Sequence, residues 1–269
     1  DAPAAFLKVK GAGRAFRMAP GAFRSRPQHD VSVGRLVPPA SDRVADFMRH
    51  FENRYRLASL GGAERIIAMA AAHHRLNYIH PFPDGNGRVS RLMSHAMALA
   101  SGIGAHGLWS VSRGLARGLT DRNEYMRMMD HADSPRADDL DGRGNLSLRA
   151  LNDFIERFLR VCLDQVVFMT HMFDIGNLSD RLTRLIAIWD TKPEAARILR
   201  RVLAAGELSR GDAVIAAGLP ERTARAILSQ LIDKGVLASS TPKGPVLLRF
   251  TAETADILFP RLFGEGSAE

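Results

Sequence analysis

Residues 79–92 bring several chemically capable side chains into one short loop and the start of the helix predicted after it. The stretch reads Ile-His-Pro-Phe-Pro-Asp-Gly-Asn-Gly-Arg-Val-Ser-Arg-Leu, and His80 stands near its beginning. An imidazole has an ordinary pKa of about 6.5, so His80 can take a proton near neutral pH. Asp84 adds a hard carboxylate oxygen of the kind that holds Mg²⁺ beside a polyphosphate. The loop therefore combines a base with a metal ligand.

The second half of this stretch favours the binding of phosphate. Gly85 and Gly87 carry no side chains, so backbone N–H groups can approach a ligand, and the N–H groups that open the next helix attract an anion. Arg88 and Arg91 are three residues apart, on one helix face, where guanidinium groups can bind further phosphate oxygens. Each feature alone is common without a ligand, but here all of them fall within twelve residues. We therefore predict a polyphosphate site.

Helices are predicted on both sides of this loop. Ser41 is an expected N-cap, and apolar residues recur after it at three- and four-residue steps. Further helical patterns cover about 64–76, 88–100, 108–117, 121–131 and 147–173. Residues 1–40 read instead as a loop-rich arm, in which the period-two alternation from Val31 to Val37 predicts a short β hairpin, the flap, at 31–39.

The chain changes its organisation after residue 175. A linker helix is predicted over 176–192, and residues 193–255 have the pattern of a winged helix-turn-helix, followed by a tail at 256–269. Its helices are expected at 193–204, 209–217 and 221–234, with two strands around the turn at 241–244.

The predicted winged helix has two readings. Arg222 and Arg225 lie near the start of helix 221–234, where a recognition helix contacts DNA. Glu221 and Asp233 dilute the charge of that face. A packing or protein-docking module is therefore an equally open reading.

The uninterrupted match of residues 80–91 to His-Pro-Phe-x-[Asp/Glu]-Gly-Asn-Gly-Arg-x-x-Arg shows that the chain resembles the Fic (filamentation induced by cAMP) family. The likeness extends over the flap and the helices from about 42 to 173. It implies an all-α (mainly) Fic core at 41–175 and a protein adenylyltransferase activity. Such enzymes use ATP and Mg²⁺ to move AMP onto a Ser, Thr or Tyr hydroxyl of a target protein and release pyrophosphate.

The resemblance also implies a role for each motif residue. His80 would be the general base for the incoming hydroxyl, and Asp84 would hold Mg²⁺ on the α- and β-phosphates. Arg88 would bind the β-phosphate and Arg91 would orient the γ-phosphate. The anion hole would be formed by Gly85, Asn86 and Gly87, and the target would dock on the flap at Val31, Ser32, Val33 and Gly34.

Composition narrows the class of protein. The chain has 37 Lys+Arg against 29 Asp+Glu, a net charge of +8, which favours anionic partners without choosing between nucleotides and nucleic acid. Cys162, the single cysteine, lies in an apolar run and is expected in the core, which suits a reducing, cytoplasmic location. No apolar stretch approaches the roughly 20 residues of a membrane span. A homodimer is a further expectation.

Several local patterns imitate other sites. Residues 139–145 resemble a calcium loop but lack its later oxygen ligands, so we expect a turn and an N-cap at Asn145 or Ser147. His73 and His74 could suggest a metal site with His80, but neighbours on a helix point about 100° apart. We expect one of them in the core and the other in solvent.

Many Fic proteins carry an inhibitory helix with the pattern [Ser/Thr]-x-x-x-Glu-[Gly/Asn]. Only Thr120 has a glutamate four residues on, Glu124, and Tyr125 follows it where Gly or Asn is required. We expect that helix upstream of Asp1, although a partner could supply it or it could be absent. The rival functions are a DNA-binding regulator whose Fic core senses nucleotide, and a Fic enzyme that uses another donor or removes AMP.

Overall fold

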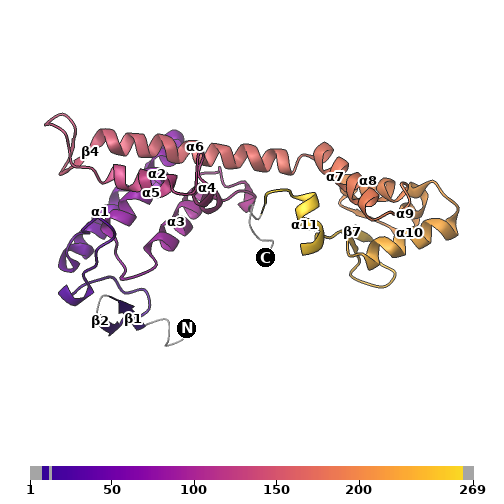
Figure 1. Cartoon of the computed structure of the whole chain (residues 1–269), viewed down its shortest axis with the longest axis horizontal. Helices are drawn as coiled ribbons and strands as arrows, with labels where there is room; N and C mark the ends of the chain where they lie inside the picture. The colour runs from indigo at the N-terminus through magenta and orange to yellow at the C-terminus, as the bar shows by residue number, and fades with distance from the viewer. Residues whose placement is uncertain (1–7, 12–13, 263–269) are drawn as a thin grey trace. The chain divides into compact units, whose positions relative to one another are not determined.

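The computed structural model describes residues 8–11 and 14–262. The chain divides into two compact units, residues 1–167 and 168–269, and the boundary falls within the long helix α6. Figure 1 shows that helices make up most of both units, as the sequence predicts. Within the described residues, no helix combines the length and the apolar character that crossing a bilayer requires. The first residues of the predicted arm and the end of the tail at 256–269 lie outside the described residues.

The first unit is built from six α-helices and two small hairpins of regular strands in the described residues. Its elements are β1 (Lys8–Gly11), β2 (Arg14–Arg17), η2 (Pro27–His29), η3 (Ser41–Arg43), α1 (Val44–Arg54), η4 (Leu57–Ser59), α2 (Gly62–Ile79), α3 (Asn86–Ala100), η5 (Ala105–Gly107), α4 (Val111–Arg117), α5 (Glu124–Ala132), β3 (Gly142–Arg143), β4 (Leu146–Ser147) and α6 (Leu148–Met172).

Three local features of this unit differ from the sequence prediction or refine it. The antiparallel pair β1–β2 was not predicted. The predicted flap has one bridge, in which Val33 and Leu36 exchange two backbone hydrogen bonds of 3.0 Å. The N-cap prediction for Ser41 was wrong, because its buried hydroxyl bonds Asp30 and Arg24 instead of a helix N–H.

Helix α2 lies at the centre of the first unit and carries the motif loop at its C-terminal end. A run of small residues, Ala70–Ala72, is buried together with Met69, which allows close packing against α3. Both His73 and His74 are 0% exposed, so the expectation that one would face solvent was wrong. The reason is that neighbouring helices cover α2 on more than one side, and α6 adds Phe154 at 5.5 Å from the His74 ring.

The start of α6 is fixed by polar caps. The Ser147 hydroxyl accepts a hydrogen bond from Ala150 N at 3.0 Å, which confirms one of the two predicted caps. Asp141 accepts from Arg149 N at 2.8 Å and from Ala137 N at 3.1 Å. The Asp141 carboxylate, in the stretch that resembles a calcium loop, thus stabilises a turn and the start of α6.

The second unit contains five helices and one three-stranded sheet in the described residues. Antiparallel pairing places β7 between β5 and β6. Helix α11 was not predicted, and Leu258 at its end is buried in the core of this unit. The elements are α7 (Ile175–Ile188), α8 (Ala195–Ala205), β5 (Glu207–Leu208), α9 (Arg210–Ala217), α10 (Glu221–Asp233), β6 (Leu237–Ala238), β7 (Val246–Leu248) and α11 (Ala252–Leu258).

Arg24 is the largest fully buried side chain among the described residues, at 1% exposure. Its guanidinium donates to the carbonyls of Pro39, Ile79 and His80 at 2.9, 3.1 and 2.7 Å. It also donates to the Asp30 carboxylate at 3.3 Å and to the Ser41 hydroxyl at 3.0 Å. All five N–H donors of the side chain are therefore used, and they join both flanks of the flap to the end of α2.

We expect Arg24→Lys to lower the free energy of unfolding by about 2–4 kcal/mol, because an ammonium cannot reach all five acceptors and leaves buried carbonyls unpaired. Urea denaturation followed by circular dichroism measures the change. Arg26→Lys is the matched control, since Arg26 is exposed. Equal stability of the two variants would contradict the role given to Arg24.

Candidate active site

His80 ends α2 in a left-handed backbone conformation, with φ 51° and ψ 57°. This conformation is uncommon for a residue with a side chain, and the hydrogen bond from Arg24 to the His80 carbonyl helps to hold it. The imidazole Nδ1 lies 3.2 Å from the carbonyl oxygen of Asn77. A carbonyl can only accept, so Nδ1 carries the proton and Nε2 keeps its lone pair. His80 is therefore in the tautomer that a base at Nε2 requires.

Burial lowers the pKa of His80 below its ordinary value of 6.5. The positive charge of Arg24 acts in the same direction, while the Asn77 carbonyl and the Asp84 carboxylate act against it. The neutral imidazole is thus favoured at neutral pH.

The loop after His80 is held by the side chain of Asn86. Its Oδ1 accepts from Phe82 N at 2.9 Å, and its Nδ2 donates to Phe82 O at 2.7 Å. Asn86 is 1% exposed, and Gly85 before it has φ 84°, a conformation that favours glycine. The side chain of Asn86 therefore shapes the loop from inside, which leaves its backbone N–H for a ligand.

The first turn of α3 offers donors to an anion. Arg88 N and Val89 N bond the carbonyl of Gly85 at 3.0 and 3.1 Å. Among the described residues, none accepts a hydrogen bond from the N–H of Asn86 or Gly87. A Cβ built on Gly87 would lie 3.3 Å from Nη1 of Arg91, so the arginine lies close over this turn. Two N–H groups and a guanidinium are thus placed for phosphate.

Asp84 in the loop and Arg88 in the first turn of α3 are both exposed. Their side chains are 81% and 72% exposed and form an ion pair of 3.5 Å. Asp84 Oδ1 also accepts from Gly85 N at 2.6 Å. The described residues contain no cluster of three metal-ligating side chains. One carboxylate on an open surface fits a Mg²⁺ that takes its other ligands from phosphate and water.

A cavity of about 510 Å³ joins the motif to the flap and to α5. The sequence-predicted residues that line it are His80, Gly87, Arg91, Val33 and Gly34. Val31 and Ser32 lie on the flap outside this lining. Asp84 and Gly85 belong to the adjoining loop, and Asn86 and Arg88 belong to the first turn of α3. Arg35 and Leu36 of the predicted flap also line the cavity. The lining residues that the sequence did not indicate are Asn77, Tyr125, Met126, Arg127, Met129, Asp130 and Asp133.

Helix α5 also lines the cavity and contacts the flap. Arg35 at the tip of the flap forms an ion pair with Asp130 of α5. Both side chains are well exposed, so this contact adds little stability. The contribution of α5 has no local sequence signal, because its residues follow the motif by more than thirty positions and resemble any amphipathic helix.

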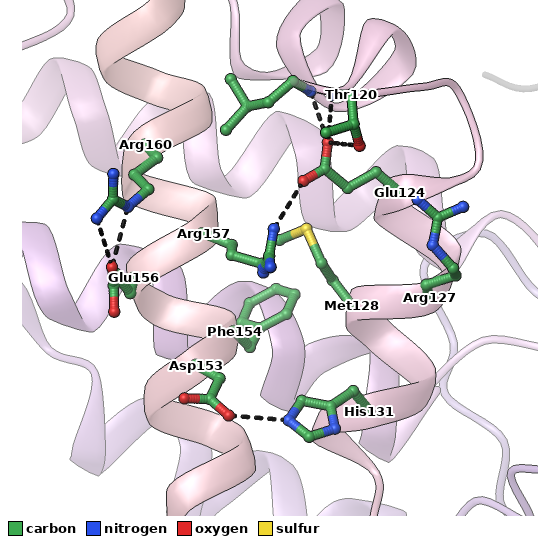
Figure 2. A pocket seen from close by; sticks show the side chains of 11 residues that line it. Thr120, Glu124, Arg127, Met128, His131, Asp153, Phe154, Glu156, Arg157 and Arg160 are labelled. Atoms are coloured by element: carbon green, nitrogen blue, oxygen red, sulfur yellow. Dashed lines mark hydrogen bonds and ion pairs between the residues drawn. The ribbon is translucent and has the colours of Figure 1, made fainter.

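A larger cavity of about 890 Å³ lies on the other side of α5, against α6, and contains no motif residue. Figure 2 shows three pairs among its polar side chains: Arg157 with Glu124, His131 with Asp153, and Arg160 with Glu156. These side chains are bonded to one another and the motif residues lie elsewhere, so we place the candidate reactive site in the smaller cavity.

Figure 2 also shows Glu124, whose spacing from Thr120 partly resembles the inhibitory motif. Glu124 accepts hydrogen bonds from Leu119 N at 2.6 Å and Thr120 N at 3.0 Å, and it also bonds the Thr120 hydroxyl. Its other oxygen accepts from Arg157 at 3.1 Å. The carboxylate is thus fully used in fixing the loop before α5, which agrees with the prediction that Glu124 is not the inhibitory glutamate.

Two remaining predictions concern single residues elsewhere. Cys162 is buried, as predicted, and burial raises the pKa of its thiol to about 12, so it is no nucleophile. Arg222 and Arg225 lie on α10 of the second unit, where Arg225 pairs with Glu221 of the same helix at 2.5 Å.

Comparison with known proteins gives one consistent family. The pattern of the Fic/DOC family matches residues 8–98. The protein adenylyltransferases Fic of Drosophila virilis and Aedes aegypti are each 37% identical to the chain over 82 residues. This match covers 30% of the chain but only 16% of each relative.

Two solved structures are more distant. A Fic-domain signalling protein from Bacteroides thetaiotaomicron is 21% identical, with a TM-score of 0.41, and the match covers 56% of this chain and 54% of that one. A Fic family protein from Desulfovibrio desulfuricans is also 21% identical, with a TM-score of 0.37, over 80% of this chain and 57% of that one.

We expect the His80 imidazole of the native protein to stay largely neutral at pH 6.5, where an unperturbed histidine is half protonated. Protonation then requires a lower pH, and the native state loses stability as the pH falls below 6.5, because the unfolded chain binds the proton more readily. NMR titration of the imidazole, compared with the chain in urea, measures this. A native midpoint at or above 6.5 would contradict the effect of burial.

Proposed function

Because residues 8–98 belong to the Fic/DOC family, we propose that the chain is a protein adenylyltransferase that transfers AMP from ATP to a hydroxyl of a target protein. One observation supports this most strongly. A single cavity is lined by the base His80, by Gly87 and Arg91 at the start of α3, and by Val33 and Gly34 of the flap. A base, a phosphate-binding helix start and a surface for a second substrate are the parts that nucleotidyl transfer requires.

His80 is proposed as the general base. Its Nε2 takes the proton from a Ser, Thr or Tyr hydroxyl of the target as the hydroxyl oxygen attacks the α-phosphorus of ATP. The new bond joins that oxygen to the α-phosphorus, and the bond between the α-phosphorus and its bridging oxygen breaks, so pyrophosphate leaves. The hydrogen bond between Nδ1 and Asn77 keeps the ring in the reactive tautomer and orientation.

The start of α3 is proposed to hold the triphosphate. The N–H groups of Asn86 and Gly87 would donate to phosphate oxygens, Arg88 would bind the β-phosphate and Arg91 would orient the γ-phosphate. Asp84 would hold Mg²⁺, which neutralises phosphate charge when it is bound. Because Arg88 is exposed and only weakly paired with Asp84, both side chains can turn toward the nucleotide.

The flap is proposed to dock the target protein. Its turn at Val33–Leu36 lines the cavity beside His80, and Val37 next to it is 78% exposed. An extended target segment placed along Val31, Ser32, Val33 and Gly34 would bring one side chain toward the imidazole.

The second unit supports the rival function less well. The order α8, β5, α9, α10, β6, β7 supports our proposal of a winged helix-turn-helix. Residues 168–269 carry 13 Lys+Arg against 12 Asp+Glu, a net +1, whereas residues 1–167 carry 24 against 17, a net +7. The pair between Arg225 and Glu221 further reduces the charge of α10. We therefore favour protein docking over DNA binding by this unit; a homodimer and a cytoplasmic location stay predictions.

Transfer is tested by incubating the chain with Mg²⁺, candidate target proteins and ATP that carries a label on the α-phosphate. Stable label on a protein band supports adenylylation, while a parallel reaction with γ-labelled ATP should leave the band unlabelled. Label from the γ-phosphate alone would favour another donor chemistry. Loss of label from a pre-modified target would favour removal of AMP.

We expect His80→Ala to lower the transfer rate by about 10²–10⁴-fold, the usual contribution of a general base, while ATP affinity changes little. Initial rates with α-labelled ATP and calorimetry with Mg·ATP measure the two effects. His50→Ala serves as the control, because His50 is exposed on α1. A variant that loses ATP binding altogether would contradict the assigned role.

We expect Asp84→Ala to raise the Mg²⁺ concentration needed for half-maximal transfer by about tenfold or more, since its carboxylate is the proposed metal ligand. Rates measured over a series of Mg²⁺ concentrations test this. Asp42→Ala, which removes an exposed carboxylate of η3, is the matched control. An unchanged Mg²⁺ dependence would place the metal ligand elsewhere.

A further inference from the structure

A buried hydrogen-bond relay lies behind the cavity and connects three helices. The Tyr125 hydroxyl of α5 is 2.9 Å from His73 Nε2 of α2. His73 Nδ1 is 2.8 Å from the Ser94 hydroxyl of α3, and Ser94 in turn bonds the carbonyl of Ser90 at 2.9 Å. The relay thus begins at a residue that lines the cavity and ends beside Arg91, which lines it too.

The direction of each hydrogen bond follows from the end of the relay. The Ser90 carbonyl can only accept, so the single proton of the Ser94 hydroxyl is donated there. Ser94 Oγ must then accept from His73 Nδ1, which leaves His73 Nε2 as an acceptor for the Tyr125 hydroxyl. The proton of Tyr125 is therefore used inside the protein, and its oxygen presents only lone pairs to other neighbours.

The protonation states agree with this direction. Burial lowers the pKa of His73 to about 3, and the charges of His74 and Arg91 act in the same direction, while the hydrogen bond that His73 donates to the Ser90 carbonyl acts against them. Burial raises the pKa of Tyr125 to about 12, although Arg91 and the Ser90 hydroxyl act in the opposite direction. At neutral pH the imidazole is neutral and the phenol keeps its proton. The charge of Arg91 is near enough to affect both groups.

We propose that Tyr125 is a positioning residue for Arg91, whose guanidinium donates an N–H to the Tyr125 oxygen while it binds the far end of the nucleotide triphosphate. This inference rests on the proposed function. Gly87 allows the guanidinium to lie over the first turn of α3, since a Cβ there would approach Arg91 Nη1 to 3.3 Å. The relay through His73 and Ser94 fixes the Tyr125 oxygen relative to the same helix, so that oxygen would be a fixed acceptor for the arginine.

A direct contact between Tyr125 and phosphate is disfavoured by the same bonding pattern. A neutral phenol whose proton is donated to His73 has only lone pairs to offer, and these repel phosphate oxygens. That oxygen can accept hydrogen bonds: the Ser90 hydroxyl interacts with it, and Arg91 is the motif cation that shares the cavity with Tyr125.

The test is Tyr125→Phe, which keeps the ring and removes the oxygen. Calorimetry with Mg·ATP and Mg·ADP separates the γ-phosphate from the rest of the nucleotide. We expect ATP affinity to fall about tenfold, the size of one hydrogen bond to a charged group, and ADP affinity to stay within about twofold. Tyr78→Phe is the matched control, because Tyr78 does not line the cavity, and thermal unfolding checks the fold of each variant.

The second arm uses Arg91→Ala. If Tyr125 acts through the arginine, Tyr125→Phe should cause no further loss of ATP affinity in that background. An additional tenfold loss there, or equal losses for ATP and ADP in the single variant, would overturn the positioning role and leave the proposed function intact. A wild-type chain that binds neither nucleotide would overturn the proposed function, and this inference with it.

Discussion

The arrangement of the candidate site depends on one buried guanidinium. Arg24 satisfies carbonyls at Pro39, Ile79 and His80, and it joins them to Asp30 and Ser41. Its backbone N–H also donates to Pro81 O at 2.8 Å, so the contact to the motif loop is made twice. The flap has one β bridge of its own and cannot be a rigid surface without such anchoring at its base. A single interaction thus fixes the distance between the surface proposed for the target and the base proposed to activate it.

The interior around α2 contains buried polar side chains that are both packed and hydrogen-bonded. His73 and His74 are completely buried, and each has a polar partner: Tyr125 and Ser94 for the first, Asp133 for the second. Aromatic rings of α6 pack against both, with Phe158 at 5.0 Å from His73. Polar groups in a core are costly when unpaired, but paired ones fix a single arrangement of neighbouring helices. In this domain they fix α5 against α2 and α3, and so define one wall of the cavity.

The sequence predicts those parts of the site whose functional residues follow one another closely in the chain. His80, Asp84, Gly87 and the two arginines follow one another within a single loop and helix start, so their residue types predict a phosphate site before any fold is known. Arg24 and Tyr125 could not be found in this way, since their partners are distant in the chain and an isolated arginine or tyrosine has no pattern. The error over His74 has a related cause. Periodicity tells which residues share a helix face, but the number of covered faces depends on how many helices pack around it.

The motif contains two kinds of group: groups that buried hydrogen bonds hold in place, and exposed side chains that can move. The backbone around Asn86 and His80 is held by buried hydrogen bonds, so the N–H groups and the imidazole are in place before a ligand arrives. Asp84 and Arg88 are exposed and hold each other by one long contact, which a polyphosphate with its metal can replace at little cost. Arg91 is intermediate between these two kinds of group. It lines the same cavity as Tyr125, which a hydrogen bond to His73 holds in place. In the proposed reaction the rigid groups would define where the α-phosphorus lies, and the exposed charged groups would neutralise the phosphates beyond it, so that geometric selection of the reacting atom would be separated from the affinity for the nucleotide.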